Sequence, residues 1–276
     1  MADTPGTART PLELRGGTAV ITGAASGIGA ALARRAAAEG MNVVVADIDL
    51  HAAQAAAAQL SNSGAEAFAV RVDVGDPVSV EALAAASYER FGDVRLLCNN
   101  AGIELSGKIW EYDVGQWERL MRVNLFGVFH GIHAFVPRML ASGGRAHIVN
   151  TSSVAALFTR PYTAAYGASK HAIVALTQSL AQELAAETEM LAVSALLPGP
   201  VATNVFDRAQ AAGSFGEQYR EAFALRLAAD GISPDAAAAI TFEGVLAGKL
   251  LIHTDLAFSK ASIEDRAAVL RASIDS

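Results

Sequence analysis

The chain has 276 residues, of which 52% are hydrophobic and 18% charged, and its formal net charge is −7. This composition is too apolar for a disordered chain and the length fits one α/β domain, so we predict a flexible N-terminal lead over residues 1–15 and a single domain over residues 16–276. A negative charge gives no attraction to nucleic acid or to an anionic membrane, and we expect neither as a partner.

The N-terminal segment, residues 1–17, contains no apolar stretch of the kind found in signal peptides, and no segment reaches the ~18 apolar residues that a membrane span needs. The single cysteine, Cys98, cannot form an internal disulfide and lies in an apolar run typical of a buried strand. We therefore expect a cytoplasmic protein.

Apolar runs typical of strands alternate along the chain with alanine-rich stretches typical of helices. The predicted strands are residues 18–22, 42–47, 65–71, 94–98, 146–151, 191–197 and 250–253. The predicted helices are residues 28–39, 52–60, 78–91, 117–140 and 164–186. Runs such as residues 43–45 are apolar without alternation, as in strands covered by helices on both faces. The predicted fold class is α/β, with a doubly wound parallel sheet of the Rossmann type and helices on both faces.

Two segments after the sixth predicted strand depart from this alternation. Residues 204–233 contain Gly213, Gly216 and Gly231 among polar and aromatic side chains, and they begin where ligands bind in such sheets. We predict a mobile substrate-covering segment there, with an ordinary helical connection as the alternative. Residues 255–276 form a C-terminal tail with apolar residues at helical spacing, which covers the sheet edge or contacts another subunit.

A glycine-rich turn, Thr22-Gly23-Ala24-Ala25-Ser26-Gly27-Ile28-Gly29, joins the first predicted strand to the first predicted helix. Glycines permit a tight turn and a close approach of the backbone to a phosphate, and the N–H groups at the helix start attract the pyrophosphate of a dinucleotide. The position between strand and helix favours a nucleotide site over a purely structural turn. The residues expected to contact the cofactor here are Gly23, Ser26, Gly27, Ile28 and Gly29.

The end of the second predicted strand indicates which cofactor is bound. Asp47 can accept hydrogen bonds from both ribose hydroxyls of NAD and would repel the 2′-phosphate of NADP. Neither residues 24–26 nor Ile48 supplies a positive charge for that phosphate, so we predict NAD; the alternative is that Asp47 only caps a turn or a helix. Asp73, after the third predicted strand, either lies near the adenine or caps the helix that follows Pro77.

The pattern Gly-x-x-x-Gly-x-Gly resembles that of the short-chain dehydrogenase/reductase family, and further motifs of the family follow it in order. They are Asn99-Asn100-Ala101-Gly102, Asn124, Ser153, Tyr166 and Lys170 in Tyr-Gly-Ala-Ser-Lys, Pro198-Gly199, and Thr203. The resemblance covers about residues 16–254. It implies seven strands in the order 3-2-1-4-5-6-7 and often a tetramer, so we expect a homo-oligomer, either a tetramer or a dimer.

The resemblance also implies further contacts with the bound NAD. The residues concerned are Asp73 and Val74 near the adenine, Asn100 and Gly102 along the dinucleotide, and Pro198, Gly199, Val201 and Thr203 near the nicotinamide. Tyr166 and Lys170 belong to the expected cofactor contacts as well as to the catalytic group.

Hydride transfer to or from an alcohol requires a group that gives or takes a proton. A tyrosine can do so if its pKa is brought toward neutrality, and Lys170, four residues after Tyr166, lies on the same helical face, where its ammonium favours tyrosinate. We expect Ser153, rather than its neighbour Ser152, to hold the substrate oxygen, because its spacing to Tyr166 matches the family. Asn124 is expected to bind a water that links Lys170 to solvent.

The loops after the fourth, fifth and sixth predicted strands supply a mostly apolar wall, so we expect a hydrophobic, cyclic or aromatic, secondary alcohol or ketone as the small-molecule substrate. The wall comprises Ile103, Glu104, Leu105, Val154, Ala155, Leu157, Phe158, Tyr162, Pro200, Val205 and Phe206. The expected substrate contacts are Ser153, Ala155, Phe158, Tyr166, Pro200 and Phe206.

Two alternative functions are considered. One is reduction of a carrier-bound 3-oxoacyl chain, which Glu187 and the preference for NAD disfavour, because the docking surface for such a carrier is basic. The other is a nucleotide-sensing or scaffolding protein that keeps the fold without chemistry. No metal site is expected, since His130 and His133 have no third ligand nearby in the sequence.

Overall fold

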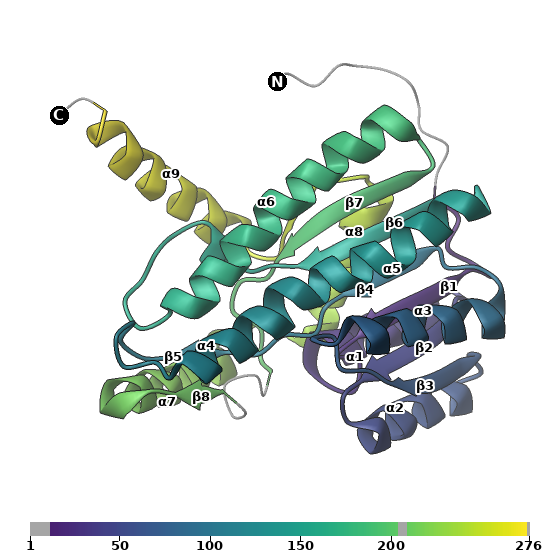
Figure 1. The fold of residues 1–276 in the computed structure, drawn as a ribbon, viewed down its shortest axis with the longest axis horizontal. Helices are drawn as coiled ribbons and strands as arrows, with labels where there is room; N and C mark the ends of the chain where they lie inside the picture. The colour runs from purple at the N-terminus through teal and green to yellow at the C-terminus, as the bar shows by residue number, and fades with distance from the viewer. Residues whose placement is uncertain (1–11, 204–208, 275–276) are drawn as a thin grey trace.

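A computed structural model of the chain describes residues 12–203 and 209–274, and its centre is a seven-stranded sheet (Figure 1). The strands are β1 (Thr18–Thr22), β2 (Asn42–Asp47), β3 (Ala67–Arg71), β4 (Leu96–Asn99), β6 (Ala146–Thr151), β7 (Leu191–Leu197) and β9 (Leu251–His253). They lie in the order β3-β2-β1-β4-β6-β7-β9, and neighbouring strands pair in parallel. The predicted doubly wound sheet and its strand order are therefore confirmed.

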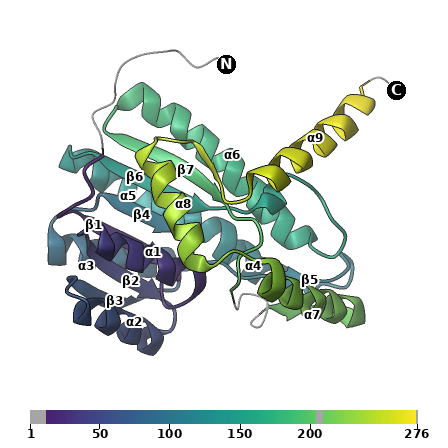
Figure 2. The same ribbon diagram turned by 180° about the vertical axis from the view of Figure 1, so that it is seen from behind.

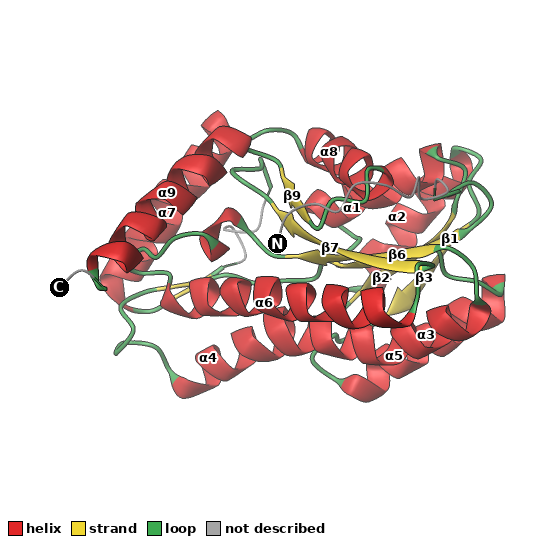
Figure 3. Cartoon of the chain, turned by 90° about the horizontal axis from the view of Figure 1, so that it is seen from above, coloured by secondary structure: helices red, strands yellow, loops and turns green. Residues whose placement is uncertain are grey.

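Helices cover both faces of this sheet, as the view from above shows (Figure 3). One face is covered by α1 (Gly27–Ala38), α2 (Leu50–Asn62) and α8 (Pro234–Leu246). The other is covered by α3 (Pro77–Phe91), α5 (Gly127–Ser142) and α6 (Ala164–Glu187). None of the described helices combines the length and the apolar character that a membrane span requires.

The apolar run of β2 shows why both faces are covered. Val43 and Val45 belong to the core that Leu32 of α1 and Phe242 of α8 help to build. Val44 points the other way, into the core on the face of α3, α5 and α6. Because neighbouring side chains of a strand point to opposite faces, a strand buried on both sides needs apolar residues at every position.

The predicted helix over residues 117–140 is divided in the structure. It consists of α4 (Val114–Met121), a π-helical turn (Arg122–Phe126) and α5. A capping box formed by Asp113 and Gln116 begins α4 before the predicted start, which explains the earlier boundary. The π-helical turn contains Asn124, and such turns occur mainly at functional sites.

A second, two-stranded sheet lies beside the main one. β5 (Leu105–Ser106) pairs in parallel with β8 (Gln210–Ala211), and α7 (Gly213–Asp230) packs against both strands. The three elements lie together at the lower left of Figure 1. The two strands were not predicted, because two-residue strands are too short to show an alternating pattern, whereas α7 lies in the segment for which a helical connection was the alternative. This small sheet ties the chain after β4 to the chain after β7, next to the carboxyl ends of the main strands.

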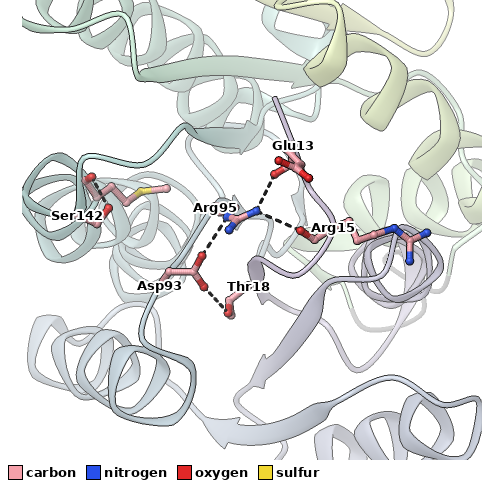
Figure 4. A network of polar contacts seen from close by, with 7 residues as sticks. Glu13, Arg15, Thr18, Asp93, Arg95 and Ser142 are labelled. Atoms are coloured by element: carbon pink, nitrogen blue, oxygen red, sulfur yellow. Dashed lines mark hydrogen bonds and ion pairs between the residues drawn. The ribbon is translucent and has the colours of Figure 1, made fainter. Parts of the chain in front are cut away.

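The described part of the N-terminal lead, residues 12–15, packs with the domain. Arg95 donates hydrogen bonds to the carbonyl oxygens of Glu13 and Arg15, each at 3.1 Å, and pairs with Asp93 at 3.0 Å (Figure 4). Asp93 in turn accepts a hydrogen bond from the hydroxyl of Thr18, at the start of β1. This network fixes where the chain enters the sheet. The rest of the lead, residues 1–11, lies outside the described residues.

The C-terminal tail forms α9 (Leu256–Ala272), which points away from the sheet in both views of the ribbon (Figures 1 and 2). Near its start, Phe258 packs edge-on against Phe158, and further along Arg266 contacts the ring of His171 on α6. Its outer part exposes Val269 and Leu270, each by more than half of the side-chain surface. The last two residues of the tail, 275–276, lie outside the described residues.

Candidate active site

The glycine-rich turn has the backbone geometry that a phosphate cradle requires. Gly23 and Gly27 have φ values of 65° and 55°, which disfavour any side chain. Gly29 lies so close to the turn that a Cβ atom there would stand 2.1 Å from the carbonyl oxygen of Gly23. Close to the turn on its other side is Thr203, whose methyl group lies 3.3 Å from the position of a Cβ on Gly27. The segment after β7 therefore reaches back to the turn.

The start of α1 leaves hydrogen-bond donors available. Ser26 precedes the helix in an extended conformation, and its side chain makes no capping hydrogen bond, while Ile28 packs against the core. The first N–H groups of a helix have no intrahelical partner, so they can bind an anion. These features fit the diphosphate of a dinucleotide.

Asp47 lies at the carboxyl end of β2, beside this turn. Its carboxylate accepts hydrogen bonds from the N–H groups of Ala25 and Asp49, both at 3.1 Å. The exposed side chain of Ile48 follows it, without a positive charge. The carboxylate is therefore held at the rim of the turn, where the sequence predicted the ribose.

The segment after β3 is the one expected to lie near the adenine. Asp73 accepts a hydrogen bond from Gly75 N–H at 2.9 Å, whereas Asp76 caps α3 through Val78 N–H. The capping role considered for Asp73 thus belongs to Asp76. Val74 is buried.

Asn100 joins the ends of three neighbouring strands. Its side-chain amide donates to the carbonyl oxygen of Thr22 at 3.0 Å, and its side-chain oxygen accepts from the hydroxyl of Thr151 at 3.3 Å. Its backbone N–H donates to the hydroxyl of Thr22 at 2.9 Å. Gly102, two residues later, is exposed, and a Cβ there would lie 3.6 Å from Nζ of Lys170. This loop therefore connects the glycine-rich turn with the predicted catalytic group.

Pro198, Gly199 and Val201 follow β7 and are held by bonds to neighbouring segments. Gly199 N–H donates to the hydroxyl of Thr254 at 2.8 Å, and Val201 pairs with Ile232 in an isolated bridge. The carbonyl oxygen of Pro198 accepts from Val154 N–H at 3.0 Å, next to Ser153. The expected nicotinamide side therefore lies beside the expected substrate serine.

Ser153, Tyr166 and Lys170 come together at the carboxyl end of β6. The Ser153 side chain is close enough to Tyr166 to favour its charged form, and Ser153 Oγ accepts from Ala155 N–H at 3.1 Å. Nζ of Lys170 lies 5.4 Å from the centre of the Tyr166 ring and donates to the carbonyl oxygen of Thr151 at 2.9 Å. Ser152, the competing serine, donates to the backbone carbonyl of Lys170 at 2.7 Å and is almost fully buried.

The pKa values in this group differ from the sequence-based expectation. Burial raises the pKa of Tyr166 above its usual range and the charge of Glu104 adds to the rise, while the hydrogen bond with Ser153 lowers it. Burial lowers the pKa of Lys170 to about 8, against the opposing effect of Glu104. The expected acidification of Tyr166 by the ammonium is therefore outweighed here by burial, which disfavours both charged forms.

Asn124 is fully buried in the π-helical turn, and its side chain is committed to protein partners. Oδ1 accepts from Ile103 N–H at 2.8 Å, and Nδ2 donates to the Ile103 carbonyl at 2.9 Å and to Ser169 Oγ at 3.3 Å. Both amide protons are therefore used by protein groups, and the water that Asn124 is expected to bind stays a prediction. The contacts indicate that Asn124 positions the loop after β4.

The expected substrate contacts surround this group from several segments. Phe158 packs edge-on against Phe258 of α9, at 5.7 Å between ring centres, and Arg160 lies over its ring. Ala155 and Pro200 are partly exposed, next to Ser153 and Gly199 respectively. Phe206 lies outside the described residues, as does the first part of the expected covering segment.

The described part of that segment covers Tyr162. The ring of Tyr162 stacks on Phe215 of α7 at 6.0 Å, and Tyr219 lies 6.1 Å away. Tyr162 has a φ of 69°, which is unusual for a residue with a side chain. These contacts connect α7 with the loop between Ser153 and Tyr166.

Comparison with known families agrees with this geometry. A family model described as short chain dehydrogenase matches residues 17–213, which is more than half of the chain. The chain belongs to the short-chain dehydrogenase/reductase family. The resemblance inferred from the motifs is therefore confirmed, and the protein is an oxidoreductase of this family.

Individual members of the family are similar over most of the chain. The 1-deoxy-11-beta-hydroxypentalenate dehydrogenase of Streptomyces exfoliatus is 40% identical over 194 residues, which cover 70% of each chain. The 2,5-dichloro-2,5-cyclohexadiene-1,4-diol dehydrogenase LinX of Sphingobium indicum is 35% identical over 197 residues, covering 70% of this chain and 78% of that one. A short-chain dehydrogenase/reductase from Burkholderia phymatum, solved in complex with NAD, is 36% identical, with a TM-score of 0.90 and coverage of 95% of this chain and 96% of that chain.

One residue of this short-chain dehydrogenase/reductase site received no role from the sequence. Glu104 was placed in the apolar wall, but the structure buries its carboxyl group near Lys170 and Tyr166. The available signal was a single acidic residue between Ile103 and Leu105, directly after the Asn-Asn-Ala-Gly motif. A charged residue in an otherwise apolar run is informative, because burying it is costly.

Proposed function

We propose that the protein transfers a hydride between NAD and a hydrophobic, cyclic secondary alcohol or ketone, with Tyr166 as the acid–base group. The observation that supports this most is the position of Lys170 Nζ 5.4 Å from the centre of the Tyr166 ring, with Ser153 close by, at the carboxyl end of the sheet. The glycine-rich turn with positive φ at Gly23 and Gly27 lies at the same edge. A bound NAD supplies the hydride acceptor and, in its oxidised form, a positive charge that favours tyrosinate.

The protein side chains have distinct tasks in this mechanism. Ser153 binds the substrate oxygen while Ala155 N–H fixes its hydroxyl. Tyr166 takes the proton from the alcohol, or gives it to the developing alkoxide in the reverse direction. Lys170 offers three donors, one of which is bonded to Thr151, so it is held in place and retains donors for a cofactor hydroxyl and a proton path.

The proposed preference for NAD is supported by Asp47. Its carboxylate is oriented by two backbone N–H groups at the edge of the glycine-rich turn. A carboxylate there accepts bonds from the ribose hydroxyls and repels a 2′-phosphate. The similarity to a family member solved with NAD agrees with this proposal.

The proposed substrate class rests on the wall around Tyr166 and on the relatives. The described wall is apolar and aromatic, with Phe158 and Tyr162 on the loop between Ser153 and Tyr166. Both curated relatives are named for hydroxylated substrates, one of them explicitly a cyclohexadiene diol. A hydrophobic ring that carries a hydroxyl or carbonyl group is the substrate class that fits both.

We further propose that α7 covers the substrate. The stacking of Phe215 and Tyr219 on Tyr162 supports the covering role.

We also propose that the protein is a homo-oligomer, a tetramer or a dimer. Phe126, at the end of the π-helical turn, and Phe129, in the first turn of α5, expose about half of their surfaces, which is unusual for large apolar side chains so close together. Light scattering during size-exclusion chromatography decides between monomer and oligomer.

The experiment that tests the catalytic proposal is a panel of cyclic alcohols assayed by NADH formation. We expect turnover by the wild type and loss of most of it in Tyr166→Phe, with NAD affinity retained. Tyr88→Phe is the matched control, because it removes a buried hydroxyl remote from the site, and it should keep wild-type turnover. Tight NAD binding without turnover of any alcohol would contradict the proposal and favour a nucleotide-sensing protein.

A further inference from the structure

The site contains a buried carboxyl group that the proposed chemistry does not use. Of the Asp, Glu, Lys and Arg side chains that the structure describes, only Glu104 and Lys170 are buried, each with 3% of its surface exposed. Lys170 has its place in the mechanism and a hydrogen bond to Thr151. Glu104 has no place in that mechanism, and one oxygen of its carboxyl group has no hydrogen-bond partner among the described residues, so its burial calls for an explanation.

The Glu104 side chain lacks the partners that would normally compensate for burial. Oε1 is buried and has no hydrogen-bond partner among the described residues. Glu104 and Lys170 interact through their charges, but no direct ion pair joins them. An unsatisfied buried polar atom costs about 1–3 kcal/mol, so a protein retains one mainly where a ligand, an ion or a water will bind it.

Glu104 lies close to the proposed acid–base group. The residue stands directly before β5, which packs against α6 on one side and α7 on the other. Its charge acts on Tyr166 of α6 and on Tyr219 of α7, so the carboxyl lies between the proposed acid–base group and the proposed cover.

A second polar atom lies on the same face of this segment. In an extended chain, residues two apart point to one side, so Glu104 and Ser106 share a face opposite to Leu105. Leu105 packs into the small core with Leu120 and Ala165, against which Tyr166 also packs. The hydroxyl of Ser106 is buried and, like Oε1 of Glu104, has no partner among the described residues. Two unpaired polar groups on one face indicate a built polar patch in an otherwise apolar wall.

We propose that Glu104 is a specificity-determining residue that binds a second oxygen of the substrate, so that the preferred substrates are cyclic diols or cyclic hydroxyketones. The inference deepens the proposed function and rests on it, because it places the second oxygen in the same site as the reacting one. Ser106, on the same face, is available to share the bond.

The chemistry of the group suits a neutral hydroxyl or carbonyl. Burial raises the pKa of Glu104 well above its usual range, which the charge of Lys170 and the N–H of Leu105 only partly oppose. A protonated carboxyl has one donor and spare acceptor capacity, so it can bond to a hydroxyl in either direction and to a ketone as the donor. Hydrogen-bonding sites of this kind discriminate strongly against analogues that lack the matching group.

The test measures binding rather than turnover, in the Tyr166→Phe background with NAD present. Cyclohexane-1,2-diol, cyclohexane-1,4-diol and cyclohexanol are titrated by calorimetry, and the ratio of the Kd of cyclohexanol to that of the better diol is the readout. Two second-site variants are compared. Glu104→Met has a similar length and no hydrogen-bonding group, whereas Glu104→Gln keeps a donor and an acceptor.

We expect the ratio to favour the diol by about tenfold or more with Glu104, to be largely kept by Glu104→Gln, and to fall to about one in Glu104→Met. A ratio that is the same with Glu104 and with Glu104→Met would overturn the inference, as would a ratio near one in the Tyr166→Phe protein that retains Glu104. The wild-type alcohol panel tests the proposed function separately. Turnover without a Glu104-dependent ratio refutes only the inference, and a Glu104-dependent ratio without turnover refutes only the proposed catalysis.

Discussion

Asn124 and Ile103 exchange two hydrogen bonds, from Ile103 N–H to Asn124 Oδ1 at 2.8 Å and from Asn124 Nδ2 to the Ile103 carbonyl at 2.9 Å. Ile103 lies between Gly102, close to Lys170, and Glu104, close to Tyr166. The pair therefore holds the loop after β4 against the π-helical turn. This loop lies next to both the proposed cofactor site and the proposed substrate site. This explains why a polar side chain is fully buried in the middle of a helical segment.

Replacing Asn124 by Ala should destabilise the protein by about 2 kcal/mol or more, because it leaves the N–H and carbonyl of Ile103 without their partner. Urea unfolding of Asn124→Ala and wild type measures the difference. Asn62→Ala is the control, since Asn62 is exposed at the end of α2, and it should change stability by no more than about 0.5 kcal/mol. Equal effects of the two substitutions would show that the Ile103 bonds contribute little.

Lys170 should make the stability of the folded protein depend on pH in the alkaline range. Its pKa falls from 10.5 to about 8 on folding, so between these values the unfolded chain binds more protons and stability rises with pH. Below pH 8 the burial penalty is fully present, and above 10.5 it is gone. Lys170→Met should therefore gain about 3 kcal/mol over wild type near pH 7, and this gain should disappear by about pH 10.5. Parallel urea titrations at several pH values would contradict this if the gain were constant.

The main sheet could be predicted from the sequence because its determinants are local. The bounds of β1, β2, β6 and β7 agree with the prediction, since each is a continuous apolar run that ends at turn-forming or polar residues. The glycine-rich turn and the motifs after β4, β6 and β7 were placed correctly at the carboxyl ends of the strands for the same reason. Whether these residues bind and act as proposed is a separate question, which the substitutions address.

What the sequence did not predict depends on contacts between distant segments. β5 exists because it pairs with β8, far along the chain, and neither strand has a pattern of its own. The π-helical turn follows from the bonds between Asn124 and Ile103, and the raised pKa of Tyr166 follows from its burial beside Leu105 and from the charge of Glu104. Local pattern cannot reveal such effects, because they arise only when the segments pack.

Asp47 should control the choice between NAD and NADP. Its removal in Asp47→Ala takes away the repulsion of the 2′-phosphate and the bonds to the ribose, so the ratio of kcat/KM for NAD to that for NADP should fall by about tenfold or more. Asp49→Ala is the matched control, because Asp49 caps α2 through Ala52 N–H and should affect stability without changing the ratio. A wild-type preference for NADP would refute the assignment directly.

The buried carboxyl group of Glu104 should lower the stability of the folded protein. Glu104→Met removes an unpartnered buried carboxyl and fills the same space with an apolar chain, so Tm should rise by about 2 °C or more. Glu118→Met, at an exposed position of α4, is the control and should leave Tm unchanged within about 1 °C. A lower Tm for Glu104→Met would mean that the carboxyl supports the fold, and not only a ligand.

Gly29 should tolerate no side chain, because a Cβ there would lie 2.1 Å from the carbonyl oxygen of Gly23 and 2.6 Å from Nδ2 of Asn100. Gly29→Ala must therefore displace the turn from α1 and from the loop after β4, and we expect a loss of about 3 kcal/mol in stability together with weaker NAD binding. Gly167→Ala is the matched control, since Gly167 lies in α6 with nothing within 4 Å of its Cβ position. Alanine is the better helix former, so this variant should gain up to about 1 kcal/mol. Changes of opposite sign in the free energy of urea unfolding would show that close packing of the turn, and not helix propensity, requires glycine at position 29. A stable Gly29→Ala variant that binds NAD normally would contradict this prediction.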